Sequence, residues 1–102
     1  MYPARDRVVH AAWIEELATA ADTLDLDEEV QSVAVDLFLH DVPAADRSKR
    51  AVAGASLYAA ALITGQERSQ GSVAAALGTS RVSVQQRWKQ RLRVAGFDPP
   101  SW

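Results

Sequence analysis

Hydrophobic residues recur at helical spacing through most of the chain. From Asp6 they form one stripe of an amphipathic helix, at Val9, Trp13, Ile14, Leu17, Ala18, Ala21 and Leu24. A second stripe runs from Val30 to Phe38; Asp27 precedes it as an N-cap and Pro43 ends it. The pattern predicts two amphipathic helices and then a loop over residues 42–47.

The segment from Ala51 to Ile63 is apolar or small around nearly its whole circumference. A helix without a polar face belongs at the centre of a bundle, because every side of it must be covered. We predict that Ser48 caps this helix and that Gly65 ends it.

Two further helices complete the pattern. A short one runs from its cap Ser69 to Leu77, and Gly78 makes a tight turn. Ser80 then caps a last helix that ends near Ala95. The chain is therefore predicted to be all-α, with five helices and no strand.

Length and composition narrow the class of protein. The chain has 102 residues and no cysteine, which fits one domain over residues 1–95 with a short tail at 96–102. Absence of cysteine excludes zinc ribbons, thiol catalysis and redox sensing. No run of about 18 uncharged apolar residues is present, and the first residues lack the pattern of an export signal. We expect a soluble cytoplasmic protein.

The charges are divided between the two halves of the chain. Residues 1–46 hold eleven acidic and two basic residues, a net charge of −9. Residues 47–102 hold two acidic and nine basic residues, a net charge of +7. This division favours a nucleic acid or another acidic partner for the second half. Two independently solvated charged faces are the alternative.

Residues 69–95 have the build of a helix-turn-helix, with a short helix, a glycine turn and a second capped helix. One side of the last helix is expected to pack on Val73 and Leu77, and it carries Val84, Trp88, Leu92 and Ala95. The opposite side is polar or basic, with Val82, Gln86, Lys89 and Arg93 flanked by Ser83, Gln85 and Gln90. No acidic residue lies within this segment.

The outward side suits DNA. Glutamine can read adenine edges, valine can meet a thymine methyl, and lysine, arginine and free helix N–H groups can bind phosphates. The expected base contacts are Val82, Ser83, Gln85 and Gln86. The expected phosphate contacts are Ser80, Arg81, Lys89 and Arg93. A solvated basic helix is the alternative interpretation.

A second basic cluster, Arg47, Lys49 and Arg50, stands at the start of the third helix, where cations oppose the helix dipole. Lys49 and Arg50 are candidates for further phosphate contacts. Pairing of this cluster with the acidic first half is an equal alternative.

No catalytic or metal-binding constellation is found. His10 and His40 are predicted on different helices, without a second histidine at i+3 or i+4. The glycines are isolated and form no phosphate-binding loop. We therefore expect no enzyme activity, no metal and no cofactor. Two roles are open for Trp102: folding back on the domain, or docking a partner.

The stretch from Ser48 to Leu92 resembles the last three helices of a cyclin-like repeat of transcription factor B, the archaeal counterpart of the eukaryotic general factor IIB. The resemblance lies in AGASLYAAAL, G.ERSQ and VAAALGTSRVSVQQRWKQ. The earlier LATAADTLDLDEEVQSVAVDLF is similar to the first two helices of the same repeat. The likeness covers about Val8 to Leu92.

This resemblance implies a five-helix cyclin-like domain with a C-terminal helix-turn-helix. In the family, the second repeat reads an element beside the TATA box in the major groove. The base-contacting valine of the family falls on Val82, its threonine on Ser83 and a phosphate-contacting basic residue on Lys89. Its base-contacting arginine falls on Gln85, which is a departure that makes adenine more compatible than guanine.

The zinc ribbon, linker and second repeat of the family are not found in the chain. We therefore expect a free-standing repeat that regulates transcription by binding double-stranded promoter DNA, as a homodimer or beside a promoter-bound partner. The alternative is a protein-interaction module that binds a basal factor such as TATA-binding protein without reading bases.

Overall fold

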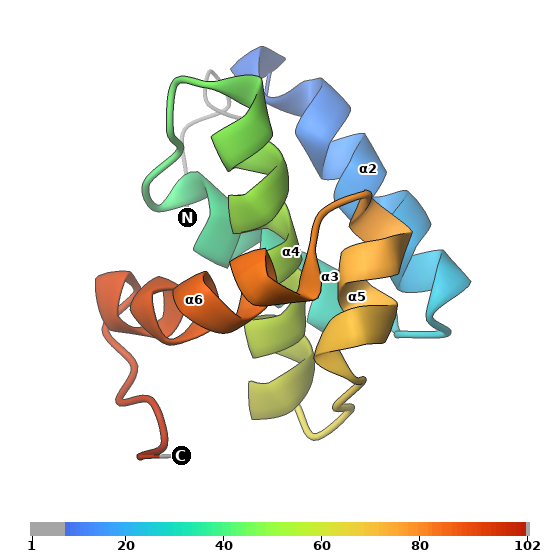
Figure 1. Cartoon of the computed structure of the whole chain (residues 1–102). Coiled ribbons are helices and arrows are strands. Elements are labelled where there is room, and N and C mark those ends of the chain that lie inside the picture. Colours follow the sequence, from blue (N-terminus) through green and yellow to red (C-terminus); the bar gives the residue numbers. More distant parts are fainter. Residues whose placement is uncertain (1–7, 102) are drawn as a thin grey trace.

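The fold is all-α, as predicted. A computed structural model describes residues 8–101 and places five helices and no strand within them. They are α2 (Ala11–Thr23), α3 (Glu28–Leu39), α4 (Asp46–Ile63), α5 (Gln70–Leu77) and α6 (Arg81–Val94) (Figure 1). Among the described residues, no helix combines the length and hydrophobicity that a membrane span requires.

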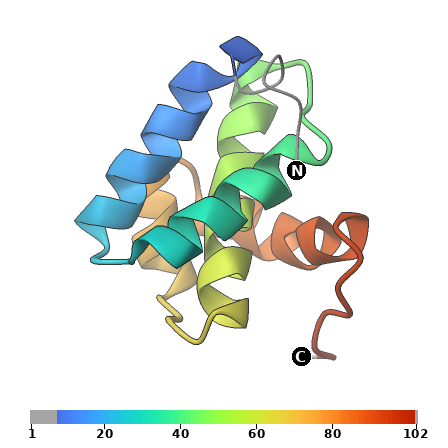
Figure 2. The ribbon, with the colours of Figure 1, turned by 180° about the vertical axis from the view of Figure 1, so that it is seen from behind.

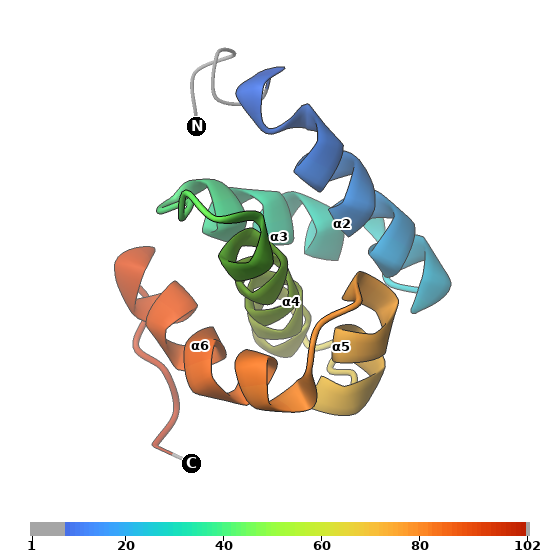
Figure 3. The same cartoon turned by 45° about the horizontal axis from the view of Figure 1, so that its top comes forward.

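Helix α4 is the centre of the molecule, as its apolar circumference predicts. Every residue from Ala51 to Ala61 is buried, and α4 contacts each of the other four helices. Viewed along its axis, α4 is surrounded by them (Figure 3). Helix α3 crosses α4 on the side opposite α6 (Figure 2). The two charged halves of the sequence are thereby brought to different sides of one apolar helix.

Local signals set most of the helix boundaries. Backbone N–H groups donate to three of the four predicted side-chain caps: Val30 to Asp27 (3.2 Å), Ser72 to Ser69 (3.0 Å) and Ser83 to Ser80 (3.1 Å). Gly78 has the positive φ of 68° that the turn after α5 requires. The three-residue turn 78–80 thus joins α5 to α6.

Two predicted helix starts are wrong. Helix α4 begins at Asp46 rather than after Ser48, and its N-cap Ala45 provides no side-chain bond. The Asp46 carboxylate takes the favourable position at the positive end of the helix dipole instead. Helix α2 begins at Ala11, so Val9 precedes it and is exposed rather than part of the buried stripe.

Helix α6 packs closely on α4 because Gly54 leaves space for it. A Cβ atom at Gly54 would lie 3.0 Å from the Thr79 methyl and 3.1 Å from a methyl of Val84. The turn 78–80 and the first turn of α6 therefore rest directly on the α4 backbone. This contact fixes where α6 begins relative to the core.

The predicted inner side of α6 is buried. Val84, Trp88 and Leu92 have at most 1% of their surface exposed and belong to the same core cluster as Val73 and Leu77. The Trp88 ring packs edge-on against Tyr58 of α4, with ring centroids 5.4 Å apart. Trp13, also expected in the core, is half-buried at its edge.

Candidate nucleic-acid interface

The outward side of α6 is largely exposed, which matches its polar sequence; its one contact with the core is the ammonium group of Lys89, 5.5 Å from the centroid of the Trp88 ring. Val82 is 58% exposed, an unusual setting for a valine at the start of a helix. Gln85, Gln86 and Arg93 are exposed as well, and Ser83 and Lys89 are partly so. An uncovered row of glutamine, serine and basic side chains without any acid is well suited to a polyanion.

The N-terminus of α6 is already organised. The Ser80 hydroxyl caps the helix and also donates to the hydroxyl of Ser83, 3.0 Å away. Arg81 and Ser80 are exposed beside it. The positive end of the helix dipole therefore lies at the surface, next to the residues that are expected to approach a nucleic acid.

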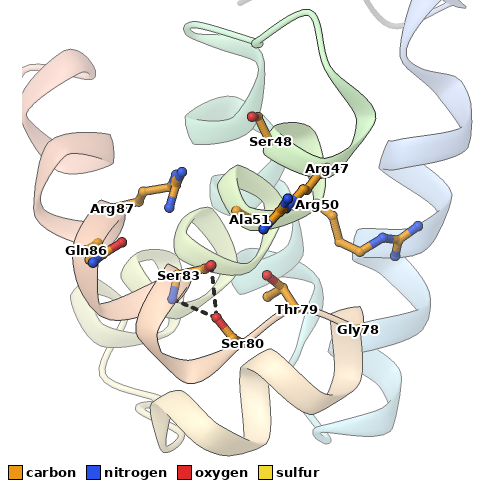
Figure 4. A pocket seen from close by; sticks show the side chains of 10 residues that line it. All are labelled: Arg47, Ser48, Arg50, Ala51, Gly78, Thr79, Ser80, Ser83, Gln86 and Arg87. Atoms are coloured by element: carbon orange, nitrogen blue, oxygen red, sulfur yellow. Dashed lines mark hydrogen bonds between the residues drawn. The ribbon is translucent and has the colours of Figure 1, made fainter.

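A hollow of about 730 Å³ lies between the first turns of α4 and of α6, with the turn 78–80 at its edge (Figure 4). Its lining includes three arginines, Arg47, Arg50 and Arg87, and no acidic residue. Four residues with hydroxyl groups and the amide of Gln86 complete the polar lining; the four are Ser48, Thr79, Ser80 and Ser83. We call this feature the arginine hollow.

Arg87 is a site residue that the sequence did not reveal. The sequence analysis assigned it to neither side of α6, and the structure places it in the arginine hollow, opposite Arg47 of α4 (Figure 4). Neither arginine forms an ion pair with an acid of the described residues. The sequence could not reveal this site residue, because the position of Arg87 in the hollow depends on how α4 and α6 pack.

Arg50 also lines the hollow, but its guanidinium is held by groups of the chain itself. Its Nη1 donates to Glu16 Oε2 (3.0 Å) and to the Leu77 carbonyl (2.9 Å). The guanidinium carbon lies 4.8 Å from the centroid of the Trp13 ring. Arg50 thereby ties α2 to the end of α5, which corresponds to the acidic pairing left open by the sequence.

Lys49 is engaged in a similar way. Its ammonium group lies 3.5 Å from the Asp46 carboxylate one turn earlier, and its side chain is mostly buried. The charged groups of Lys49 and Arg50 are thus already paired within the chain, whereas Arg47 and Arg87 form no ion pair with an acid of the described residues.

The acidic residues gather on α2, α3 and the turn between them, where most are exposed. Asp27 is the most strongly organised, because the Gln66 amide donates to its Oδ2 over 2.7 Å. That bond, together with the N–H of Val30, lowers the pKa of the Asp27 carboxyl. The acidic surface on α2 and α3 thus lies apart from the basic outward side of α6.

Two expectations concern features outside this interface. No group of three histidine, aspartate or glutamate side chains that might hold a metal occurs in residues 8–101. Trp102, whose role the sequence left open, lies outside the described residues.

Comparison with known proteins gives one match. The family model described as "Transcription factor TFIIB repeat" matches residues 10–93, which include α2 to α5 and all of α6 except its last residue, Val94. No curated protein matches the chain, and no solved structure does.

Proposed function

Since the chain belongs to the family of transcription factor TFIIB repeats, a transcription-related family with a cyclin-like all-α fold, we propose that it is a sequence-specific regulator that inserts α6 into the major groove of promoter DNA. The observation that carries the proposal is the outward side of α6: exposed, free of acids and not used by the core. In this proposal, α5, the turn 78–80 and α6 act as a helix-turn-helix.

The first turns of α6 hold the residues proposed to read bases. Val82 would contact a thymine methyl, and Ser83, Gln85 and Gln86 would hydrogen-bond base edges. These side chains follow the exposed N-terminus of the helix, which is the end that enters the groove in such motifs. Their exposure supports this assignment.

Basic and hydroxyl groups around them are proposed to bind the phosphate backbone. Lys89 and Arg93 lie farther along the outward side, and Ser80 and Arg81 flank the helix N-terminus. To these we add Arg47 and Arg87, because the arginine hollow presents both without an acidic partner. Arg50 and Lys49 are assigned instead to positioning the hollow, because their charged groups are already paired.

A domain of this size buries only about 600–1,000 Å² on DNA. Tight binding therefore calls for a homodimer or for a partner already on the promoter, such as TATA-binding protein. The exposed acids of α2 and α3 favour an additional protein contact. They also support the second candidate function, a module that binds a basal transcription protein without base readout.

A binding titration against pooled genomic fragments separates the two functions. Selective retention of promoter fragments supports DNA reading, and Lys89→Ala should then lower the salt slope by about one, since one phosphate contact is lost. Gln86→Ala should relax preference at one base pair, by about 1–3 kcal/mol on the best site. Ser32→Ala, an exposed change on α3, is the control and should alter neither quantity.

Gln86→Ala should melt at the wild-type temperature, because Gln86 is exposed. Lys89→Ala should melt slightly lower, because it loses the contact of the ammonium group with the Trp88 ring, 5.5 Å away, which contributes about 0.5–1 kcal/mol. Absence of selective binding at any salt concentration, together with capture of TATA-binding protein, would refute DNA reading and support the interaction module.

A further inference from the structure

Helices α5 and α6 are joined by one hydrogen bond between their side chains. Gln70, the first residue of α5, donates from Nε2 to Oε1 of Gln85 in the second turn of α6. Among the side-chain hydrogen bonds of the described residues, no other joins these two helices. The bond is directional: the oxygen end of the Gln85 amide faces Gln70.

Gln70 is itself held from the core side. It hydrogen-bonds the phenol of Tyr58, whose side chain is only 4% exposed and packs against Trp88. The phenol donates in turn to Oε2 of Glu67, over 3.5 Å. Burial raises the pKa of Tyr58 and so does the Glu67 charge, whereas the bond with Gln70 lowers it.

The bond between the two glutamines has a defined direction. Gln70 donates from its amino group, so the oxygen of the Gln85 amide is the end that faces α5. On the core side, the Glu67 carboxylate can only accept, so the Tyr58 phenol is the donor to it.

An amide with a fixed oxygen end cannot read every base. Its oxygen keeps a second lone pair, so the edge of Gln85 presents one acceptor and one donor in a fixed order. Adenine offers the complementary pair, the N6 donor and the N7 acceptor. Guanine offers two acceptors, and its O6 would face the amide oxygen. A freely rotating amide would instead turn its amino group toward guanine.

We infer that Gln70 is a positioning residue that, through its bond to Gln85, makes α6 select adenine over guanine at one base pair. The inference rests on the proposed function, since it requires α6 to lie in the major groove. Gln85 is the proposed base contact, and Gln70 acts only through it.

The test starts from a binding site selected in vitro with the wild-type chain. Gln85→Ala identifies the base pair that Gln85 contacts, and duplexes with adenine or guanine there are compared by fluorescence anisotropy. Gln70→Met, which keeps the length of the side chain but removes its donors, should reduce the adenine-to-guanine affinity ratio roughly three- to tenfold, the worth of one hydrogen bond. Gln31→Met on α3 is the matched control and should keep the ratio.

Tyr58→Phe tests the inner part of the chain of bonds. It removes only the hydroxyl and keeps the ring that packs on Trp88, so the domain should stay folded while the ratio falls. A second readout needs no DNA. In NMR spectra of the free protein, the side-chain amide of Gln85 should be more mobile in Gln70→Met than in the wild type.

The outcomes separate the inference from the proposed function. A wild-type chain that selects no sequence refutes both. A selected site whose adenine preference survives Gln70→Met refutes the inference alone, and so does a Gln85 amide that is equally mobile in both proteins.

Discussion

Arg91 is the most informative residue for a stability test, because it is a basic residue of α6 that lies inside the protein. It is 3% exposed, and its Nη2 donates to the carbonyl oxygens of Leu37 (2.7 Å) and Phe38 (3.4 Å). Both carbonyls belong to the last turn of α3, where no intrahelical N–H is available and the helix dipole is negative. Arg91→Met keeps most of the side-chain volume but removes the charge and the donors.

The short bond to Leu37 accounts for most of the expected loss. A hydrogen bond that involves a charged group contributes about 1.5–3 kcal/mol, and the longer bond to Phe38 adds little. We expect Arg91→Met to lower the free energy of unfolding by about 2–3 kcal/mol. For a domain of about 100 residues this corresponds to a fall in Tm of roughly 8–24 °C.

Thermal melts followed by circular dichroism measure this effect. Arg93→Met is the matched control, since Arg93 is exposed on the same helix and its loss should change stability by less than about 0.5 kcal/mol. The reasoning is refuted if the two variants melt at the same temperature. In DNA-binding titrations at a temperature where both variants are folded, only Arg93→Met should lower the salt slope, because only Arg93 is proposed to contact a phosphate.

Three further changes test the packing, the turn and the charges. Gly54→Ala should destabilise the domain by about 1 kcal/mol in urea unfolding, because its Cβ would lie 3.0 and 3.1 Å from the methyls of Thr79 and Val84, and displacing them, at about 1–3 kcal/mol, costs more than the gain of about 0.5–1 kcal/mol in helix propensity; a more stable variant would contradict the close contact of α6 with α4. Gly78→Ala should cost about 1 kcal/mol through its φ of 68°, and Gly78→Asn less, so equal urea midpoints for the two variants would argue against backbone strain. The lowered pKa of Asp27 means that its carboxylate adds stability above its ordinary pKa of 3.8, and that this is lost as pH falls through the folded value. In Asp27→Asn this part of the acid sensitivity should disappear from urea midpoints measured between about pH 2 and 6, whereas an identical pH profile would show that the bond to Gln66 is unimportant.

Most of the fold was accessible from the sequence because its signals are local. The buried stripe of α6, the apolar circumference of α4 and the caps Asp27, Ser69 and Ser80 depend on spacing within one helix. The start of α4 was predicted three residues too late, with Ser48 rather than Ala45 as the N-cap, because Ser48 is a good cap in isolation. The charge of Asp46 at the helix N-terminus outweighs it.

The site was accessible only in part, because several of its residues depend on contacts between helices. The outward side of α6 follows from helical periodicity, but periodicity cannot show that Arg91 reaches the end of α3. Nor can it show that Arg87 faces Arg47, or that Gln70 meets Gln85. Each of these pairs joins residues from different helices, and their proximity is set by how α4, α5 and α6 cross.

The lengthwise division of α6 has a consequence for how the domain can change over evolution and in the laboratory. Its buried side holds the fold, and Val82, Gln86 and Arg93 on its other side contact no part of the core. Substitutions at these three positions therefore leave folding nearly untouched, so a library randomised there should consist mainly of folded proteins. Single substitutions can therefore change the recognised DNA sequence one after another, and each variant along the way stays folded. Gln85 is the exception, because its exchange must be matched at Gln70.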